Sequence, residues 1–296
     1  MKRIAIVIYP NTRPFFVEVA IATLKALQSL GHDAFESSNP GAVSADLEII
    51  FGNGFKVYGI PLWPKAADRK RVFFNMEMLP QTKEQFAEPW RAQSIKQIED
   101  LAPLVDGFLD TAPDNVEAGK THLQKLGLKT PFAHCPPGYH ESFDHSDVVL
   151  PQTTDVLFFG ALTGRRVGLL DAIKKQASVT ASQCLFGKDR DRAMAQAKIN
   201  LNLHVTGHGC SLGLRVPVFF LSSGRFFVSE KIDGWNPLRD GEHYRLWDQE
   251  DPDFFRKLLS DEAQRTRIGK QGREFLKNEY PYSKTLVRAL KELNVL

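Results

Sequence analysis

The chain has 296 residues, of which 43% are hydrophobic, and 38 basic against 35 acidic residues give a net charge of +3. This length suits two medium domains or one large one with an ordinary core, and so small a charge selects neither anionic small molecules nor nucleic acid as the ligand. Three widely spaced cysteines, an odd number without a CxxC pair, argue against a disulfide framework.

The N-terminal segment carries two basic residues and then an apolar run of about six residues, shorter than the ~7–15 residues of a signal-peptide core. No stretch approaches the ~18 apolar residues of a membrane span. We therefore expect a buried first strand over residues 3–9 and a soluble, cytoplasmic enzyme.

The first half of the chain alternates short apolar runs with segments of helical periodicity. We predict strands over 3–9, 32–36, 47–51, 71–75, 105–109 and 130–134, and helices over 16–30, 85–101 and 115–126. Apolar strands that alternate with helices in this way are typical of an α/β domain with a mostly parallel sheet.

The polar, proline-rich stretch 135–154 is the best candidate for a linker, and the alternation restarts after it. We predict strands over 155–159, 179–186, 199–203 and 226–229, and helices over 165–176, 190–197, 216–222, 252–259, 261–279 and 282–293. Asp251 is the expected N-cap of the helix over 252–259. Two α/β domains with a cleft between them follow, over residues 1–145 and 146–280, with residues 281–296 as a terminal helix.

Glycines and basic residues of the second half lie where predicted strands end or helices begin. Gly160 ends a strand and would let the backbone approach a ligand, while Arg165 and Arg166 open the next helix, whose free N–H groups suit phosphate. The same reasoning marks Gly187, Lys188 and Arg215. The structural alternatives are exposed helix-start residues and an ordinary turn.

Histidines and a carboxylate follow two further predicted strands. His204 comes directly after the strand over 199–203, and His208 lies in the glycine-rich loop behind it. A zinc site is a weak competitor, because no third ligand is near these histidines. Ser229 and Glu230 end the strand over 226–229, where a carboxylate could accept hydrogen bonds from sugar hydroxyls. Together these residues suggest a cradle for a diphosphate attached to a sugar.

The first half offers its own candidates at strand ends. Asn11, Thr12 and Arg13 follow the first strand and would contact an acceptor. Glu77 and Asp110 each end another strand, and either carboxylate could act as a general base. Spacing alone does not choose between them.

Several stretches carry a resemblance to a known family. The segments DVLFFGALTGRR (155–166), AKINLNLH (197–204) and LRVPVFFLSSGRFFVSE (214–230) resemble GT-B glycosyltransferases, as does VFFNMEML (72–79). The tail over 240–284 is similar to that of family-4-like and spore-maturation-protein-like glycosyltransferases. The resemblance spans most of residues 70–285, and the order and spacing of the motifs carry it.

The resemblance implies two facing Rossmann-like domains, with a nucleotide-sugar donor mainly on the C-terminal domain and the acceptor on the N-terminal one. It also implies a last helix that crosses back to the first domain, and no metal or other cofactor. One position departs from the pattern: many retaining relatives hold the donor ribose with a glutamate five residues before the glycine that corresponds to Gly224, and here Phe219 stands there. Ribose recognition must differ, or Glu230 must serve, which leaves the donor and the stereochemistry open.

The main hypothesis is a metal-independent hexosyl- or pentosyltransferase in which Arg165, Lys188 and Arg215 neutralise the departing diphosphate. The acceptor is a glycan, a small molecule or a modified DNA base. One alternative is a non-catalytic protein that binds sugar nucleotides or phospho-ligands. Another is a DNA-modifying glycosyltransferase, for which a modest basic cluster could contact phosphates; its members are Lys65, Arg69, Lys70 and Arg71.

Overall fold

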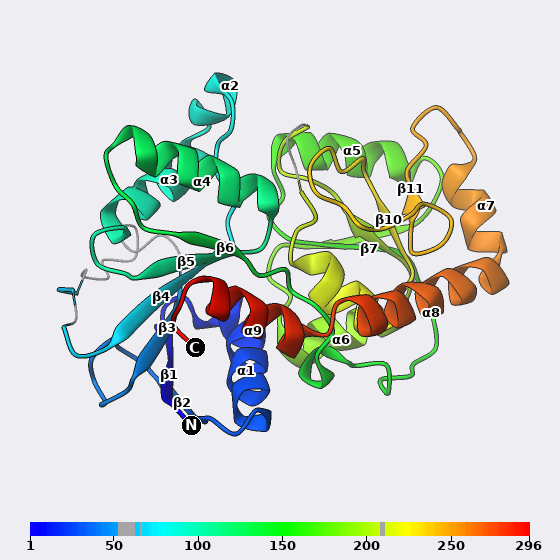
Figure 1. Ribbon diagram of the computed structural model, residues 1–296. Helices are drawn as coiled ribbons and strands as arrows, with labels where there is room; N and C mark the ends of the chain where they lie inside the picture. The colour runs from blue at the N-terminus through cyan, green and yellow to red at the C-terminus, as the bar shows by residue number, and fades with distance from the viewer. Residues whose placement is uncertain (53–62, 66, 208–210) are drawn as a thin grey trace. The chain divides into compact units, whose positions relative to one another are not determined.

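The computed structural model describes residues 1–52, 63–65, 67–207 and 211–296. The chain forms two compact units, Met1–Ser142 with Tyr282–Leu296, and Phe143–Pro281. Each unit is built on one parallel β-sheet with helices packed around it (Figure 1). The predicted fold class, α/β with two Rossmann-like domains, is confirmed.

The first unit has a six-stranded sheet in the order β2-β1-β3-β4-β5-β6. Its central strands are buried on both faces because helices cover both, and the rings of Phe108 and Phe132 stack with centroids 4.6 Å apart in the core. The elements are β1 (Arg3–Ile8), α1 (Arg13–Ser29), β2 (Asp33–Ser37), β3 (Leu47–Phe51), β4 (Lys70–Asn75), α2 (Lys83–Phe86), α3 (Pro89–Leu101), β5 (Gly107–Asp110), α4 (Pro113–Lys125), β6 (Phe132–His134) and η1 (Glu141–Phe143), the last a 3-10 turn that reaches into the second unit.

The helix predicted over 85–101 is two helices in the structure. Thr82 and Gln85 form a capping box that starts the short α2, and α3 begins separately at Pro89. Proline lacks an amide hydrogen and fits only the first turn of a helix, so a continuous helix through this position is disfavoured. The break leaves α2 as a separate element beside α4.

The terminal helix α9 (Tyr282–Glu292) belongs to the first unit. It packs against α1, where the buried hydroxyl groups of Tyr282 and Thr23 lie 2.7 Å apart. The Thr285 hydroxyl donates a hydrogen bond to the Pro136 carbonyl over 3.1 Å. In Figure 1 this red helix lies beside the blue α1, so the two ends of the chain complete one unit.

The second unit has a five-stranded sheet in the order β11-β10-β9-β7-β8. Its elements are β7 (Thr154–Phe159), α5 (Gly164–Lys174), β8 (Val179–Ser182), α6 (Gly187–Gln196), β9 (Ala197–Asn202), η2 (Arg215–Leu221), β10 (Phe227–Ser229), β11 (Arg245–Leu246), α7 (Phe254–Ser260) and α8 (Glu262–Glu279). No helix in the described part of the chain has the length and apolarity that a membrane span requires.

Two local predictions in this unit were wrong. The edge strand β8 ends at Ser182 rather than continuing to residue 186, because only its first four residues pair with β7. The N-cap of α7 is Asp253, not Asp251; the Asp251 carboxylate instead accepts a hydrogen bond from the Asp253 amide at 3.0 Å. The helix therefore begins one short turn later than the sequence pattern indicates.

The segment that carries Arg215 is a π-helical turn, η2. The amide of Ser222 donates to the carbonyl of Pro217 over 3.2 Å, a bond that spans five residues instead of the usual four. π-Helical turns are rare and occur often at functional sites. Pro217 fits here because its missing amide lies in the first turn.

Helix α8 packs very closely on the turn before β10. A Cβ atom on Gly269 would lie 2.5 Å from the carbonyl oxygen of Gly224, which cannot yield because it is backbone. We expect Gly269→Ala to cost about 3 kcal/mol of stability, or roughly 6–12 °C in the melting temperature of this unit. Gly168→Ala, on the exposed side of α5 where a Cβ meets nothing, should instead stabilise slightly. Thermal denaturation measures both, and equal effects would contradict the packing argument.

Candidate functional site

The candidate site lies in the second unit, at the carboxyl ends of three neighbouring strands. Gly160 directly follows β7, Glu230 directly follows β10, and His204 comes two residues after β9. In parallel sheets the carboxyl ends of adjacent strands meet at one edge, which is where open α/β folds bind ligands. The sheet therefore brings residues from three distant segments together.

Glu230 is the centre of a polar cluster at this edge. Its side chain is 4% exposed and accepts hydrogen bonds from the His204 amide at 2.8 Å and from Arg165 Nη1 at 3.0 Å, with Arg165 Nη2 bonded to its other oxygen. Ser229 supports it from behind, because its hydroxyl donates to the Glu230 carbonyl and accepts from Asn202. The carboxylate is thus fixed in place before any ligand arrives.

The two arginines at the start of α5 have different roles. Arg165 is one-third exposed and pairs with Glu230. Arg166 is buried and directs its guanidinium to the main-chain carbonyls of Leu203, His204 and Ala161. Arg166 therefore fixes the start of α5 to the end of β9. These hydrogen bonds do not support the predicted contact between Arg166 and a diphosphate.

Arg215, at the start of η2, is a cation with no hydrogen-bonded or ion-paired partner among the described residues. Its guanidinium carbon lies 5.4 Å and 5.1 Å from the ring centres of Phe158 and Phe159. A Cβ on Gly160, whose φ is +132°, would lie 2.5 Å from Arg215 Nη2, so a larger residue would have a strained backbone and would displace the guanidinium. Within the described ranges, no hydrogen bond or ion pair reaches this group.

The environment of Arg215 disfavours its charge. Burial, and to a smaller extent the nearby Arg166, lower the pKa of Arg215 to about 9. The side chain still carries its proton at neutral pH, so an uncompensated positive charge lies at the strand ends. An anion in contact with it would remove that penalty, because opposite charges stabilise each other strongly where water is excluded.

The environment of His204 favours the neutral form of its ring. Burial lowers its pKa, and the charge of Glu230 opposes that shift. Its Nε2 atom is buried and has no hydrogen-bond partner among the residues that the structure describes. A neutral imidazole with an unsatisfied ring nitrogen can bond a hydroxyl group or a phosphate oxygen of a ligand.

The other residues predicted to bind the nucleotide-sugar donor are not joined to this cluster by bonds in the described part of the chain. Gly187 and Lys188 begin α6 at the carboxyl end of β8, and Lys188 is exposed. No bond within the described chain joins Lys188 to the Arg165–Glu230 cluster. His208 lies outside the described residues. No group of three metal-ligating side chains occurs in the part of the chain that the structure covers.

The candidates at the end of β1 are engaged within the first unit. The buried Thr12 donates its hydroxyl hydrogen to the Tyr9 carbonyl over 3.2 Å, and Arg13 pairs with Glu36. Asn11 is exposed. Of these three residues, only Asn11 therefore presents an unengaged side chain.

The two candidate bases differ in access to solvent. Glu77 follows β4 and is half-buried, and its carbonyl accepts hydrogen bonds from the side chains of Asn75 and Asn115. Asp110 is fully buried, and burial raises its pKa to about 7 although Asn75, Asn115 and the Ala112 amide donate to it. Asp110 thus fixes the loops after β4 and β5 and does not reach an acceptor here.

Close to this network, His134 gives the fold a dependence on pH. Burial lowers the pKa of His134 to about 4, below the ~6.5 of an unfolded chain. The unfolded state therefore takes up this proton at a higher pH than the folded state does. The contribution of the neutral His134 ring to the free energy of unfolding is complete above pH 6.5 and is lost as the pH falls toward 4. The free energy of unfolding can change by at most ~1.4 kcal/mol per pH unit from this group, and we expect a smaller change because the ring is partly exposed.

We expect His134→Gln to flatten this pH dependence. Thermal denaturation between pH 7 and pH 4.5 should show a smaller loss of melting temperature in the variant than in the native chain. His145→Gln serves as a control in the other unit. Parallel curves for native protein and His134→Gln would show that this histidine does not titrate as expected.

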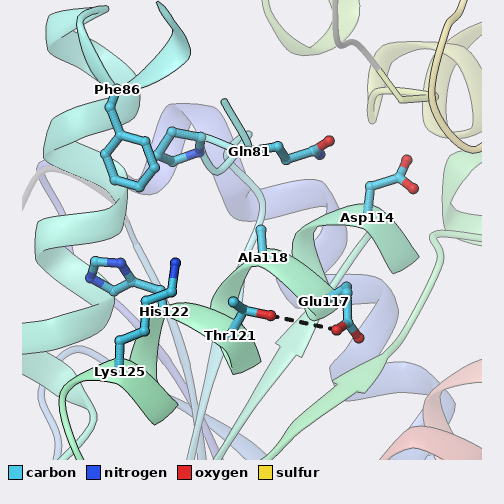
Figure 2. Close-up of a pocket in the computed structure, with 9 residues that line it drawn as sticks. Gln81, Phe86, Asp114, Glu117, Ala118, Thr121, His122 and Lys125 are labelled. Carbon is cyan, nitrogen blue, oxygen red and sulfur yellow. Dashed lines mark hydrogen bonds between the residues drawn. The ribbon is translucent and has the colours of Figure 1, made fainter. Parts of the chain in front are cut away.

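The first unit also contains a pocket of about 320 Å³ along α2 and α4. Figure 2 shows the ring of Phe86 facing that of His122 at one end, with centroids 6.1 Å apart, and Asp114 and Gln81 at the other. Thr121 bonds to Glu117 along the wall. The pocket thus joins an exposed aromatic ring to carboxylate, amide and hydroxyl groups.

Comparison with solved structures identifies the fold. A structure of Anabaena HepE in complex with UDP and glucose matches with a TM-score of 0.62 at 11% identity, over 100% of both chains. An alpha-glucosyltransferase in complex with UDP-glucose and DNA containing an abasic site matches with a TM-score of 0.63 at 11% identity, over 99% of each chain. AviGT4, a glycosyltransferase involved in avilamycin A biosynthesis, matches with a TM-score of 0.55 at 13% identity, over 99% of this chain and 98% of that one.

No protein-family model matches the chain, and no curated protein matches its sequence. The chain has the GT-B fold of glycosyltransferases, and the predicted resemblance to that fold is confirmed. At these identities the likeness establishes the fold and leaves the chemistry to the residues of this chain.

Two features of the site were missed by sequence reasoning. One is the pair Phe158 and Phe159, whose rings hold the Arg215 guanidinium; the FFG motif was the available signal. The other is the pocket along α2 and α4, the groove beside Phe86. Sequence reasoning missed it because only Pro89 indicates that α2 and α3 are separate helices. Both depend on contacts between segments far apart in the chain.

Proposed function

We propose that the protein is a glycosyltransferase that transfers a sugar from a nucleotide-sugar donor bound at the carboxyl edge of the second sheet. The observation that carries this proposal is Arg215, a protonated guanidinium close to the rings of Phe158 and Phe159 and without a carboxylate partner among the described residues. A half-buried cation of this kind suits the negative charge that grows on a departing diphosphate.

The remaining residues take supporting roles in this proposal. His204 would bond a sugar hydroxyl or a phosphate oxygen through its unsatisfied Nε2, and Gly160 would admit the ligand close to the backbone. Glu230 would accept hydroxyl groups of the sugar or ribose, since Phe219 stands where many relatives have a glutamate. Arg165 would position Glu230 and add positive charge, with Lys188 at the rim. No metal is needed in this scheme.

We further propose a uridine diphosphate sugar as the donor and a neutral, hydroxyl-rich molecule as the acceptor. The solved structures with this fold include complexes with UDP and with UDP-glucose. The acceptor would bind on the first unit, in the groove beside Phe86, where a ring face and carboxylates suit sugar hydroxyls better than phosphates. Glu77, half-buried after β4, is the stronger candidate for a base if the reaction inverts.

A DNA acceptor is less favoured, although a related fold was solved with DNA. The basic cluster that would contact phosphates is neutralised internally. Arg71 is buried and pairs with Glu48, Arg69 pairs with Asp68, and Lys70 bonds to Asp106. Steeply salt-dependent binding to a DNA duplex would overturn this preference.

A thermal-shift screen tests the donor. UDP, GDP and ADP are compared with their glucose conjugates, and a ligand at 100 times its Kd should add about 2.7 kcal/mol of stability. We expect the uridine compounds to give the largest shift. Release of nucleotide from the donor without acceptor then separates an enzyme from a protein that only binds, and no shift with any nucleotide would refute the proposed donor site.

A further inference from the structure

The Phe143–Pro281 unit contains a pocket of its own, which lies at the opposite ends of the strands from Arg215. Its volume is about 440 Å³. It is bounded by Lys198 near the start of β9, by Arg225 and Phe226 directly before β10, and by the inner face of α8. These positions are at the amino ends of the strands, whereas the candidate donor site is at their carboxyl ends. The two sites are therefore separate.

The lining of this pocket is strongly positive. Five basic side chains line it and only one acidic side chain, Glu262; the basic residues are Lys198, Arg225, Arg265, Lys270 and Arg273. Two of the cations have carboxylate partners outside the lining: Lys198 pairs with Asp155, and Arg273 pairs with Asp144. The other three form no ion pair within the described ranges. The charges of Asp144, Asp147 and Asp191 act on Arg225, and those of Asp155, Asp261 and Glu262 act on Arg265, so they reduce the excess of positive charge at the lining without forming ion pairs there.

Arg225 and Arg265 are held in fixed orientations by main-chain carbonyls. Arg225 Nη2 donates to His145 and Val148 at 2.9 and 2.8 Å, and Arg265 Nη1 donates to Leu258 and Leu259. Arg265 is only 5% exposed. The Nε atoms of both arginines are buried and lack a partner among the described residues. Carbonyl oxygens orient a guanidinium but do not cancel its charge, so both remain cations with donor capacity to spare.

The pocket is rigid as well as charged. The turn at Gly224, with φ at +65°, packs directly against Gly269 of α8. Ser223 ties this turn to the preceding segment, because its hydroxyl donates to the Phe143 carbonyl and accepts from the His145 amide. Fixed guanidinium groups lose little entropy on binding, which favours a ligand whose oxygens match their fork geometry.

We propose that this pocket binds a small phosphorylated molecule, independently of the nucleotide-sugar site. Guanidinium groups recognise phosphate through paired N–H donors, and a volume of about 440 Å³ is in the range of small-molecule sites. The pocket lies within one unit, so its occupancy does not depend on the proposed transferase reaction. A phosphate group bound here would tie the segment after Phe143 to β10 and α8.

The test uses inorganic pyrophosphate and the full chain carrying Arg215→Met, so that the candidate donor site does not contribute. Titration calorimetry should show saturable binding at constant ionic strength. Lys270→Glu reverses the charge of an exposed lining residue that has no partner in the described chain, and it should weaken binding at least tenfold. The matched control is Arg267→Glu, on the same helix and outside the pocket, which should change the affinity less than twofold.

Several results would overturn the proposal. One is the absence of saturable pyrophosphate binding in the Arg215→Met background. Another is an equal loss in Lys270→Glu and Arg267→Glu, which would indicate general charge attraction. A third is binding of an oligonucleotide with no binding of pyrophosphate, which would make the surface a nucleic-acid contact. None of these three results depends on whether uridine compounds bind to the native protein.

Discussion

Replacement of Arg215 by methionine should lower the rate of sugar transfer by about 10²–10³-fold, because it removes a fixed charge from the leaving diphosphate. The same change should not lower the melting temperature of the ligand-free protein. Methionine keeps much of the contact with Phe158 and Phe159, and the substitution removes a half-buried cation that has no carboxylate partner among the described residues. Loss of activity together with unchanged or increased stability is characteristic of a functional residue.

Arg215→Lys separates charge from geometry. A lysine keeps the positive charge but not the forked donors, so an intermediate loss of activity is expected. Turnover is measured with the donor identified by thermal shift, and stability is measured on the same preparations. If Arg215→Met melted several degrees lower and still responded to the donor, Arg215 would be a packing residue and the proposed site would fail.

Glu230→Gln is expected to produce the second large effect, in this case on both stability and donor binding. Glu230 accepts from the His204 amide and from two nitrogens of Arg165 at a site that is 4% exposed. The glutamine side chain carries no negative charge, and its NH2 group would face one of the N–H groups that now donate to the carboxylate. We expect this mismatch to cost about 2 kcal/mol of stability. That cost corresponds to roughly 4–8 °C in the melting temperature of the second unit.

Asp171→Asn provides the matched comparison for Glu230→Gln. Asp171 pairs with Lys174 on α5, and both side chains are more than half exposed, so this pair should contribute only a few tenths of a kcal/mol. Donor affinity, measured by titration, should fall in Glu230→Gln and stay unchanged in Asp171→Asn. Equal melting temperatures for the two variants would show that the Glu230 cluster does not stabilise the fold.

The fold was largely predictable from the sequence because its strands are short apolar runs separated by helices. Predicted strands over 47–51 and 199–203 fall within one or two residues of β3 and β9. The errors occur where local pattern and pairing disagree. Residues 183–186 look like a strand but pair with no strand in the described part of the chain, and the helix over 85–101 is interrupted by Pro89.

The site was only partly predictable, for a physical reason. Position at a strand end predicts that a residue can reach the binding edge, and the structure places Gly160, His204 and Glu230 at such positions. Arg215 was predicted from its position at the start of a helix, and it begins η2. Whether a charge is available depends on partners distant in sequence. Arg165 and Arg166 look alike in the sequence, yet one pairs with Glu230 and the other bonds to carbonyls at the end of β9. No spacing rule distinguishes those two outcomes.

The return of α9 to the first unit has a consequence for biosynthesis. Residues 143–281 contain every strand and helix of the second unit, so that unit can fold as soon as they leave the ribosome. The unit that is translated first must wait, because α1 stays uncovered on the side that Tyr282 occupies until the final helix has emerged. The unit that contains α1 is therefore completed only after residues 143–281 have been made.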